Sequence, residues 1–117
     1  MIRVFIQTLG FSRRVAGRMD DDQLRRLESD IQKGGGAVMP GTGGFRKIRC
    51  PGRGRGKSGG WRVIFADYPQ FGVTVLVAAY EKSWKLDVTP AERNALRQIR
   101  VIVDREMELT YGQEDIL

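Results

Sequence analysis

Residues 61–80 read WRVIFADYPQFGVTVLVAAY, two apolar runs separated by a short segment with one proline. The first run, Trp61 to Asp67, and the second, Val73 to Tyr80, are rich in valine, isoleucine and aromatic residues, which favour β-strands. The segment between them, Tyr68 to Gly72, contains Pro69 and is typical of a turn. The sequence therefore predicts an antiparallel β-hairpin.

Two further strands are predicted upstream of this hairpin. Phe45 to Arg49 is a short strand in which Lys47 and Arg49 alternate with Ile48, so the basic pair shares one face. Ile2 to Thr8 alternates apolar and polar residues in the same way. Together with the hairpin, these segments supply enough strands for one small sheet.

A helix is predicted after the first strand, preceded by a short helical turn around Phe11 to Gly17. Asp20 and Gln23 have the spacing of a capping box, which satisfies free backbone N–H groups at a helix start. Leucines and an isoleucine then recur at helical spacing, with charged residues between them. The three glycines 34–36 end this helix, since glycine adopts the left-handed C-cap conformation at least cost.

The last helix has the clearest start in the chain. Residues 89–92 read TPAE, an N-cap threonine followed by a first-turn proline and a capping-box glutamate. The helical pattern continues to about Met107. Leu96, Ile99 and Val103 form one stripe along it, and we expect this stripe to pack into the core.

The order of these elements predicts the fold class. A strand, one or two helices, three sequential strands and a final helix indicate an α+β domain: a small, mainly antiparallel β-sheet with helices packed on it. The chain of 117 residues contains neither an internal repeat nor an interdomain linker, so we expect residues 1–117 to form a single domain.

Positive charge is concentrated in one part of the sequence. Residues 43–62 read GGFRKIRCPGRGRGKSGGWR, with seven basic side chains and no acid. The wider acid-free window, residues 31–66, holds eight Lys and Arg, whereas the other residues carry twelve basic against fourteen acidic side chains. The chain's net charge of +6 is therefore local. Such a field attracts phosphates, so a nucleic acid is the expected partner.

The composition also excludes several kinds of site. The chain has no histidine, which excludes His-ligated zinc and histidine-based catalytic triads. Cys50 is the single cysteine, so no intrachain disulfide can form, and we expect it to be a small packing residue. The N-terminal residues 1–10 have too short an apolar stretch for a signal peptide, and no segment approaches the length of a membrane span. We therefore expect a cytoplasmic protein with no membrane partner and no cofactor.

A site built from these cations would suit one reaction, the attack of a ribose 2′-hydroxyl on its own phosphate. The RNA supplies the nucleophile, and the protein positions it, moves protons and stabilises the charge that develops on the phosphorane. Lys47 lies among other cations, which disfavour its charged form, and Arg62 is a natural phosphate ligand. We expect Tyr80 or Trp84 to stack on a base.

Three blocks of sequence resemble the RelE/HigB family of type II toxins, most closely its HigB-like branch. They are GTGGFRKIR, the glycine-rich loop ending in GKSGGWRVIF, and YEKSWKLDVTPAERNAL. The resemblance covers roughly residues 41–99, and the N-terminal part only in pattern. It implies the RelE-like microbial ribonuclease fold, and messenger RNA cleavage in the ribosomal A site without a metal. It also implies neutralisation by a cognate antitoxin of the HigA-like, DNA-binding kind.

The resemblance also assigns roles to individual residues. Lys47 or Arg49 would help to activate the 2′-hydroxyl, and Arg62 would hold the scissile phosphate. Lys85 or Lys82 would protonate the leaving 5′-oxygen. The family's tyrosine falls on Tyr80, so the expected catalytic residues are Lys47, Arg49, Arg62, Tyr80, Lys82 and Lys85. Five further residues are expected to bind RNA: Arg46, Arg53, Arg55, Lys57 and Trp84.

Two other functions remain open. A ParE-like toxin has the same fold but acts by binding DNA gyrase, and it would leave the shared basic face without a purpose. A non-catalytic RNA-binding module would use the basic loop and Tyr80 without cleaving the RNA. Replacement of Arg62 separates the functions, because it abolishes the toxicity of a nuclease but only weakens the affinity of a binding module.

Overall fold

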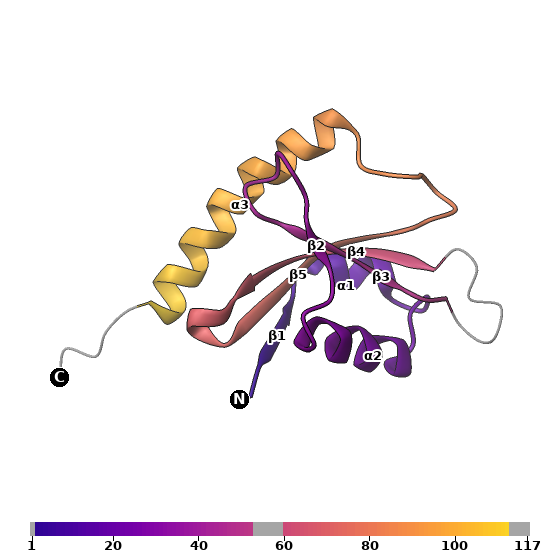
Figure 1. The fold of residues 1–117 in the computed structure, drawn as a ribbon, viewed down its shortest axis with the longest axis horizontal. Coiled ribbons are helices and arrows are strands. Elements are labelled where there is room, and N and C mark those ends of the chain that lie inside the picture. The colour runs from indigo at the N-terminus through magenta and orange to yellow at the C-terminus, as the bar shows by residue number, and fades with distance from the viewer. Residues whose placement is uncertain (1, 53–59, 113–117) are drawn as a thin grey trace.

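The structure is a computed structural model that describes residues 2–52 and 60–112 (Figure 1). Its elements are β1 (Val4–Gln7), α1 (Leu9–Val15), α2 (Asp21–Gln32), β2 (Ala37–Val38), β3 (Arg46–Cys50), β4 (Trp61–Tyr68), the 3-10 turn η1 (Pro69–Phe71), β5 (Val73–Glu81) and α3 (Pro90–Tyr111). The predicted α+β class, with a mainly antiparallel sheet and helices packed on it, is confirmed.

The five strands form one sheet in the order β1-β5-β4-β3-β2. The predicted hairpin is its centre, since β4 and β5 pair antiparallel from Trp61–Glu81 to Tyr68–Val73. β3 adds antiparallel to β4, and the two-residue β2, which the sequence did not predict, pairs with β3. β1 pairs with β5 in parallel. A parallel pair needs a long connection between its strands, and α1 and α2 are part of the segment that connects β1 to the rest of the sheet.

The core has two layers because helices cover both faces of the sheet. α2 lies on one side and α3 on the other (Figure 1). Trp61, Val63 and Phe65 of β4 pack with α1 and α2, whereas Ile64, Ala66 and Tyr68 pack on the α3 side. This alternation shows that β4 is buried on both faces, as is its neighbour β5. No helix among the described residues is long and apolar enough to cross a membrane.

Both predicted capping boxes are present. The Asp20 carboxylate accepts a hydrogen bond from the Gln23 backbone, and the Gln23 side chain accepts one from Asp20, at the start of α2. Thr89 and Glu92 do the same at the start of α3. α2 ends where Gly34 takes a φ of 88°, a conformation that favours glycine.

α3 differs from the helix expected from its sequence. It extends to Tyr111, beyond the predicted end near Met107, and buries only Leu96 and Met107. The expected core stripe is wrong in part, because Ile99 is 39% exposed. Polar contacts help to hold the helix, since the Tyr68 hydroxyl donates to Asp104 at 2.6 Å and Arg100 pairs with the same carboxylate. Burial and the bond to Asp104 raise the pKa of Tyr68.

Cys50 is a buried packing residue, as predicted, and its thiol should make stability depend on pH. Burial raises the pKa of Cys50 from 9.0 to about 11. Between these values the unfolded thiol ionises and the folded thiol does not, so the free energy of unfolding should fall as pH rises from about 9 to about 11. Urea titrations across this range should show a shallower fall in Cys50→Ala. Parallel curves for the two proteins would contradict the buried, protonated thiol.

Candidate functional site

A row of three side chains crosses the sheet on its α3 side. Arg49 of β3 is opposite Arg62 of β4, and Arg62 is opposite Tyr80 of β5. Arg49 lies between Ile48 and Cys50 in the strand, and both of these side chains face the α2 layer. Because side chains alternate along a strand, Arg49 points to the other face. Neighbouring strands are about 4.8 Å apart, which brings these side chains together. The sequence predicted the shared face of Lys47 and Arg49, and the register adds Arg62 to it.

Arg62 occupies the middle of this row. Its side chain is partly buried, and one guanidinium nitrogen lies 3.4 Å from the carbonyl oxygen of Trp61. Within residues 2–52 and 60–112 it forms no ion pair. A guanidinium that is half-buried but not neutralised by a carboxylate can bind an incoming phosphate in bidentate geometry.

Lys47 has an acidic partner that no local sequence pattern predicts. Its Nζ lies 3.0 Å from Asp87, whose second oxygen pairs with Arg93 at 3.2 Å. The hydrogen bond from Lys47, together with one from the Val88 backbone, lowers the pKa of Asp87. The expectation of a lysine crowded only by cations is therefore wrong. Asp87 follows the last strand and folds back over β3, a contact across forty positions.

The Asp87 contact gives a prediction about its titration. Because Lys47 is the main cause of the lowered pKa, Lys47→Gln should return the Asp87 midpoint toward 3.8. The side-chain carboxyl signal of Asp87, followed by NMR over an acid titration, measures this directly. Arg25→Gln is a matched control, because Arg25 pairs with Asp22 on α2. An Asp87 midpoint that does not move in Lys47→Gln would contradict the ion pair.

Lys85 is likewise paired with an acid. It contacts Glu92 of α3, and this hydrogen bond is the main cause of a lowered pKa of Glu92. The Lys85 ammonium also lies 5.2 Å from the centre of the Tyr80 ring. Glu92 also accepts a hydrogen bond from the Thr89 backbone N–H at the start of α3. It therefore links the start of this helix to Lys85 on the basic face.

Tyr80 does not offer the stacking surface that was predicted for it. The residue is only 5% exposed, and its hydroxyl is buried with no hydrogen-bond partner among the described residues. Tyr80 is on the sheet's α3 face, where Val88 and Leu96 belong to the same cluster. The ring therefore packs against Lys85, and it cannot stack on a base in this conformation.

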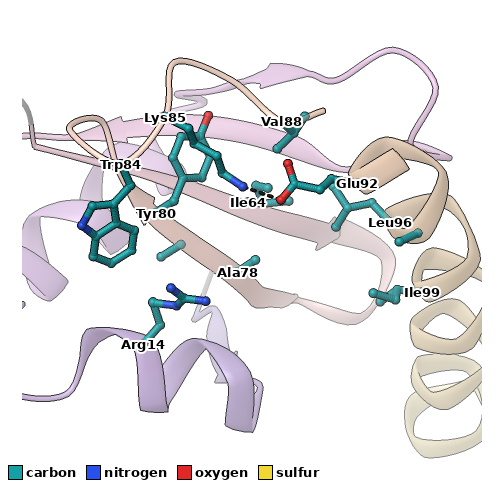
Figure 2. A pocket seen from close by; sticks show the side chains of 12 residues that line it. Arg14, Ile64, Ala78, Tyr80, Trp84, Lys85, Val88, Glu92, Leu96 and Ile99 are labelled. Atoms are coloured by element: carbon teal, nitrogen blue, oxygen red, sulfur yellow. Dashed lines mark hydrogen bonds and ion pairs between the residues drawn. The ribbon is translucent and has the colours of Figure 1, made fainter. Parts of the chain in front are cut away.

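Trp84 is partly exposed, but its ring already has neighbours. It meets Trp61 edge-on at 5.5 Å, and the guanidinium groups of Arg14 and Arg18 lie 5.2 and 5.5 Å from its centre. α1 and the turn after it thus contribute two cations, Arg14 and Arg18, beside the site, and the sequence had assigned them no role. Figure 2 shows Arg14 on α1 and Trp84 beside the end of β5.

A pocket of about 460 Å³ lies next to this cluster (Figure 2). Its walls come from α1, the end of β5 and the first turns of α3. Most of its lining is apolar, and the charged groups in it are Arg14 and the Lys85–Glu92 pair. The full lining is Arg14, Ile64, Ala78, Ala79, Tyr80, Trp84, Lys85, Val88, Glu92, Ala95, Leu96 and Ile99.

The remaining predicted residues are not part of this cluster. Arg46 lies on the opposite face of β3, where it donates to the carbonyl of Gly36 at 2.9 Å, so its predicted RNA contact stays a prediction separate from this cluster. Lys82 is exposed in the turn after β5. Arg53, Arg55 and Lys57 lie outside the described residues.

In the described part of the chain, no three His, Cys, Asp or Glu residues gather closely enough to hold a metal ion. The groups that the site offers for chemistry are its charged side chains. They are Arg49 and Arg62 on the sheet, and Lys47 and Lys85, each of which is paired with a carboxylate.

No protein-family model matches the chain.

Proposed function

We propose that the protein is the toxin of a type II toxin–antitoxin system and cleaves messenger RNA on the ribosome. Its partners would be the ribosome, the mRNA and a cognate antitoxin of the HigA-like, DNA-binding kind, all in the cytoplasm. The support is the resemblance of residues 41–99 to the RelE/HigB toxins and the α+β fold, which is compatible with theirs. The candidate site gives further support.

The observation that supports RNA cleavage is the pair of arginines in the row across β3, β4 and β5. Arg62 has no carboxylate partner among the described residues, and Arg49 is directly opposite it. Two adjacent guanidinium groups can hold the scissile phosphate and stabilise the negative charge of the phosphorane. A gyrase-binding protein would not need this arrangement.

The proposed reaction transfers the phosphoryl group within the RNA. The 2′-hydroxyl gives its proton to a solvent water and attacks the adjacent phosphorus, the bond to the 5′-oxygen breaks, and that oxygen takes up a proton from Lys85. The products are a 2′,3′-cyclic phosphate and a 5′-hydroxyl. Lys47, which Asp87 orients, lies two positions from Arg49 and would assist the 2′-hydroxyl. Lys85, which Glu92 holds, would supply the proton to the leaving oxygen.

Translating ribosomes carrying a defined mRNA in the A site provide the test. The purified chain should cut this mRNA and leave a 5′-hydroxyl, whereas an mRNA with a single 2′-deoxy sugar at the cut position should stay intact. Cleavage of the deoxy-substituted mRNA would rule out 2′-hydroxyl attack. Binding of the mRNA without any cleavage would favour the non-catalytic RNA-binding function.

A further inference from the structure

The segment between β5 and α3 is tied to β3 through one carboxylate, that of Asp87. One of its oxygens lies 3.0 Å from Lys47 Nζ on β3, and the other lies 3.2 Å from the Arg93 guanidinium on α3. The backbone N–H of Val88 donates to the first oxygen at 2.7 Å. Two cations and a backbone donor therefore converge on one carboxylate, an arrangement that binds oxyanions in general. We call Lys47, Arg93 and the Val88 N–H the Asp87 site.

The carboxylate is the most exposed part of this site. The side chain of Asp87 is 49% exposed, whereas those of Lys47 and Arg93 are 28% and 29% exposed. Ion pairs that water reaches contribute little to stability, because solvent screens the charges. A phosphate, which carries more acceptor oxygens than the two of a carboxylate, can therefore replace Asp87 on these donors at little cost to the fold.

The Asp87 site is one step along β3 from the row of Arg49, Arg62 and Tyr80. Lys47 and Arg49 are two positions apart in the strand and share one face, so they are separated by about 6.8 Å along it. Consecutive phosphates of an unstacked single strand are separated by a similar distance. An RNA whose scissile phosphate lies on Arg49 and Arg62 would thus bring a neighbouring phosphate to Lys47.

Arg93 is the cation of the Asp87 site that has no other assigned role. Another nitrogen of its guanidinium donates to the carbonyl of Pro40 at 2.9 Å, in the loop between β2 and β3. This contact does not involve Asp87, so it holds the guanidinium in position when the carboxylate leaves. Arginine stays charged at neutral pH and has several N–H donors, so the nitrogen that now faces Asp87 can bind a phosphate instead.

We propose that Lys47, Arg93 and the Val88 N–H bind the RNA phosphate next to the scissile one, and that this phosphate replaces the Asp87 carboxylate. Asp87 orients Lys47 in the free protein, and the phosphate does so in the complex. Lys47 has several N–H donors, so it contacts this phosphate and the 2′-hydroxyl of the same nucleotide. Arg93 is then a further substrate-binding residue, contributed by α3. The inference rests on the proposed function for its ligand, a phosphodiester of single-stranded RNA.

Replacement of the carboxylate by a phosphate implies opposite effects for two members of the site. Loss of the Arg93 charge removes a ligand of the phosphate and should weaken RNA binding. Loss of the Asp87 charge removes the group that competes with the phosphate and should strengthen it. A cluster with only a structural role would give the same sign for both, because either substitution leaves the other group without its partner.

A fluorescent oligouridine with 2′-O-methyl sugars tests the proposal, because it cannot be cleaved. Fluorescence anisotropy with the full chain is measured over a range of salt concentrations. Arg93→Gln should weaken binding about tenfold and reduce the slope of log K against log salt by about 0.7, the share of one phosphate on a single strand. Arg93→Lys should restore the slope. Arg97→Gln, one turn further along α3 where Arg97 contacts only Asn94 in the described chain, is the matched control and should keep the parent slope.

The competing carboxylate is tested with the same oligouridine. Asp87→Asn should bind it about three- to fivefold more tightly. Asp22→Asn is the control, because Asp22 is also an exposed partner of an arginine but lies on α2, on the other side of the sheet. In the Arg93→Gln background the gain from Asp87→Asn should be smaller, since part of the phosphate site is already lost. Circular dichroism and urea midpoints establish that each variant is folded.

Several outcomes would overturn the proposal. They are no saturable binding of the oligouridine, an unchanged salt slope in Arg93→Gln, equal losses in Arg93→Gln and Arg97→Gln, or weaker binding by Asp87→Asn. Cleavage on ribosomes is a separate measurement. A chain that gives the expected binding results and leaves mRNA intact would contradict the nuclease and support the phosphate site.

Discussion

Arg62→Gln is expected to slow mRNA cleavage by about 100- to 1,000-fold, the effect of removing one group that stabilises charge in a transition state. The guanidinium lies in the middle of the row across β3, β4 and β5, and no carboxylate in the described chain neutralises it. Glutamine keeps a polar side chain of similar reach but lacks the charge and the fork of donors. Single-turnover cleavage on programmed ribosomes measures the change.

Arg25→Gln is the control for this result. Arg25 is exposed on α2, on the other side of the sheet, and pairs with Asp22 one turn away. Arg25→Gln removes the same charge from the chain as Arg62→Gln does. The cleavage rate of Arg25→Gln should therefore stay within about twofold of the parent rate if the position of the charge matters more than the net charge. Equal losses in the two variants would mean that Arg62 acts only through the general positive field.

Phe65→Ala should have the largest effect on stability, a loss of about 3–5 kcal/mol in the free energy of unfolding. Phe65 is 1% exposed in the central strand β4 and packs under α2. The edge of its ring also approaches the backbone at Gly36, where a Cβ would come within 3.0 Å. Because small domains have about 5–15 kcal/mol in total, this variant should be only marginally folded.

Urea denaturation measures this loss, with Val101→Ala as the comparison. Val101 is 67% exposed on α3, so its replacement should change stability by no more than about 0.5 kcal/mol. An equal effect of the two substitutions, at unchanged dependence on urea, would contradict the two-layer core.

Local sequence patterns predicted the parts of the fold that depend on local physics. The capping boxes at Asp20 and Thr89 determine where the helices begin, because they act over three residues. Alternation put Lys47 and Arg49 on one face. The two-residue β2 was missed because so short a strand has no period of its own.

The site was predicted less completely because its contacts are distant in the sequence. Asp87 reaches Lys47 across forty positions, and Glu92 could be recognised only as a helix cap. Tyr80 is a ring that suits stacking, yet tertiary packing buries it under Lys85. Arg14 and Arg18 reach the site because α1 packs beside β5, which no periodicity of the chain indicates.

The most direct test of the proposed function is to map new 5′ ends in a bacterial host that expresses the chain. Translated and untranslated copies of one transcript are compared, with Arg62→Gln expressed in parallel. Cuts are expected in the translated copy alone, and they should be lost in the variant. Growth arrest without new 5′ ends would contradict the nuclease, and cuts in both copies would contradict its dependence on the ribosome.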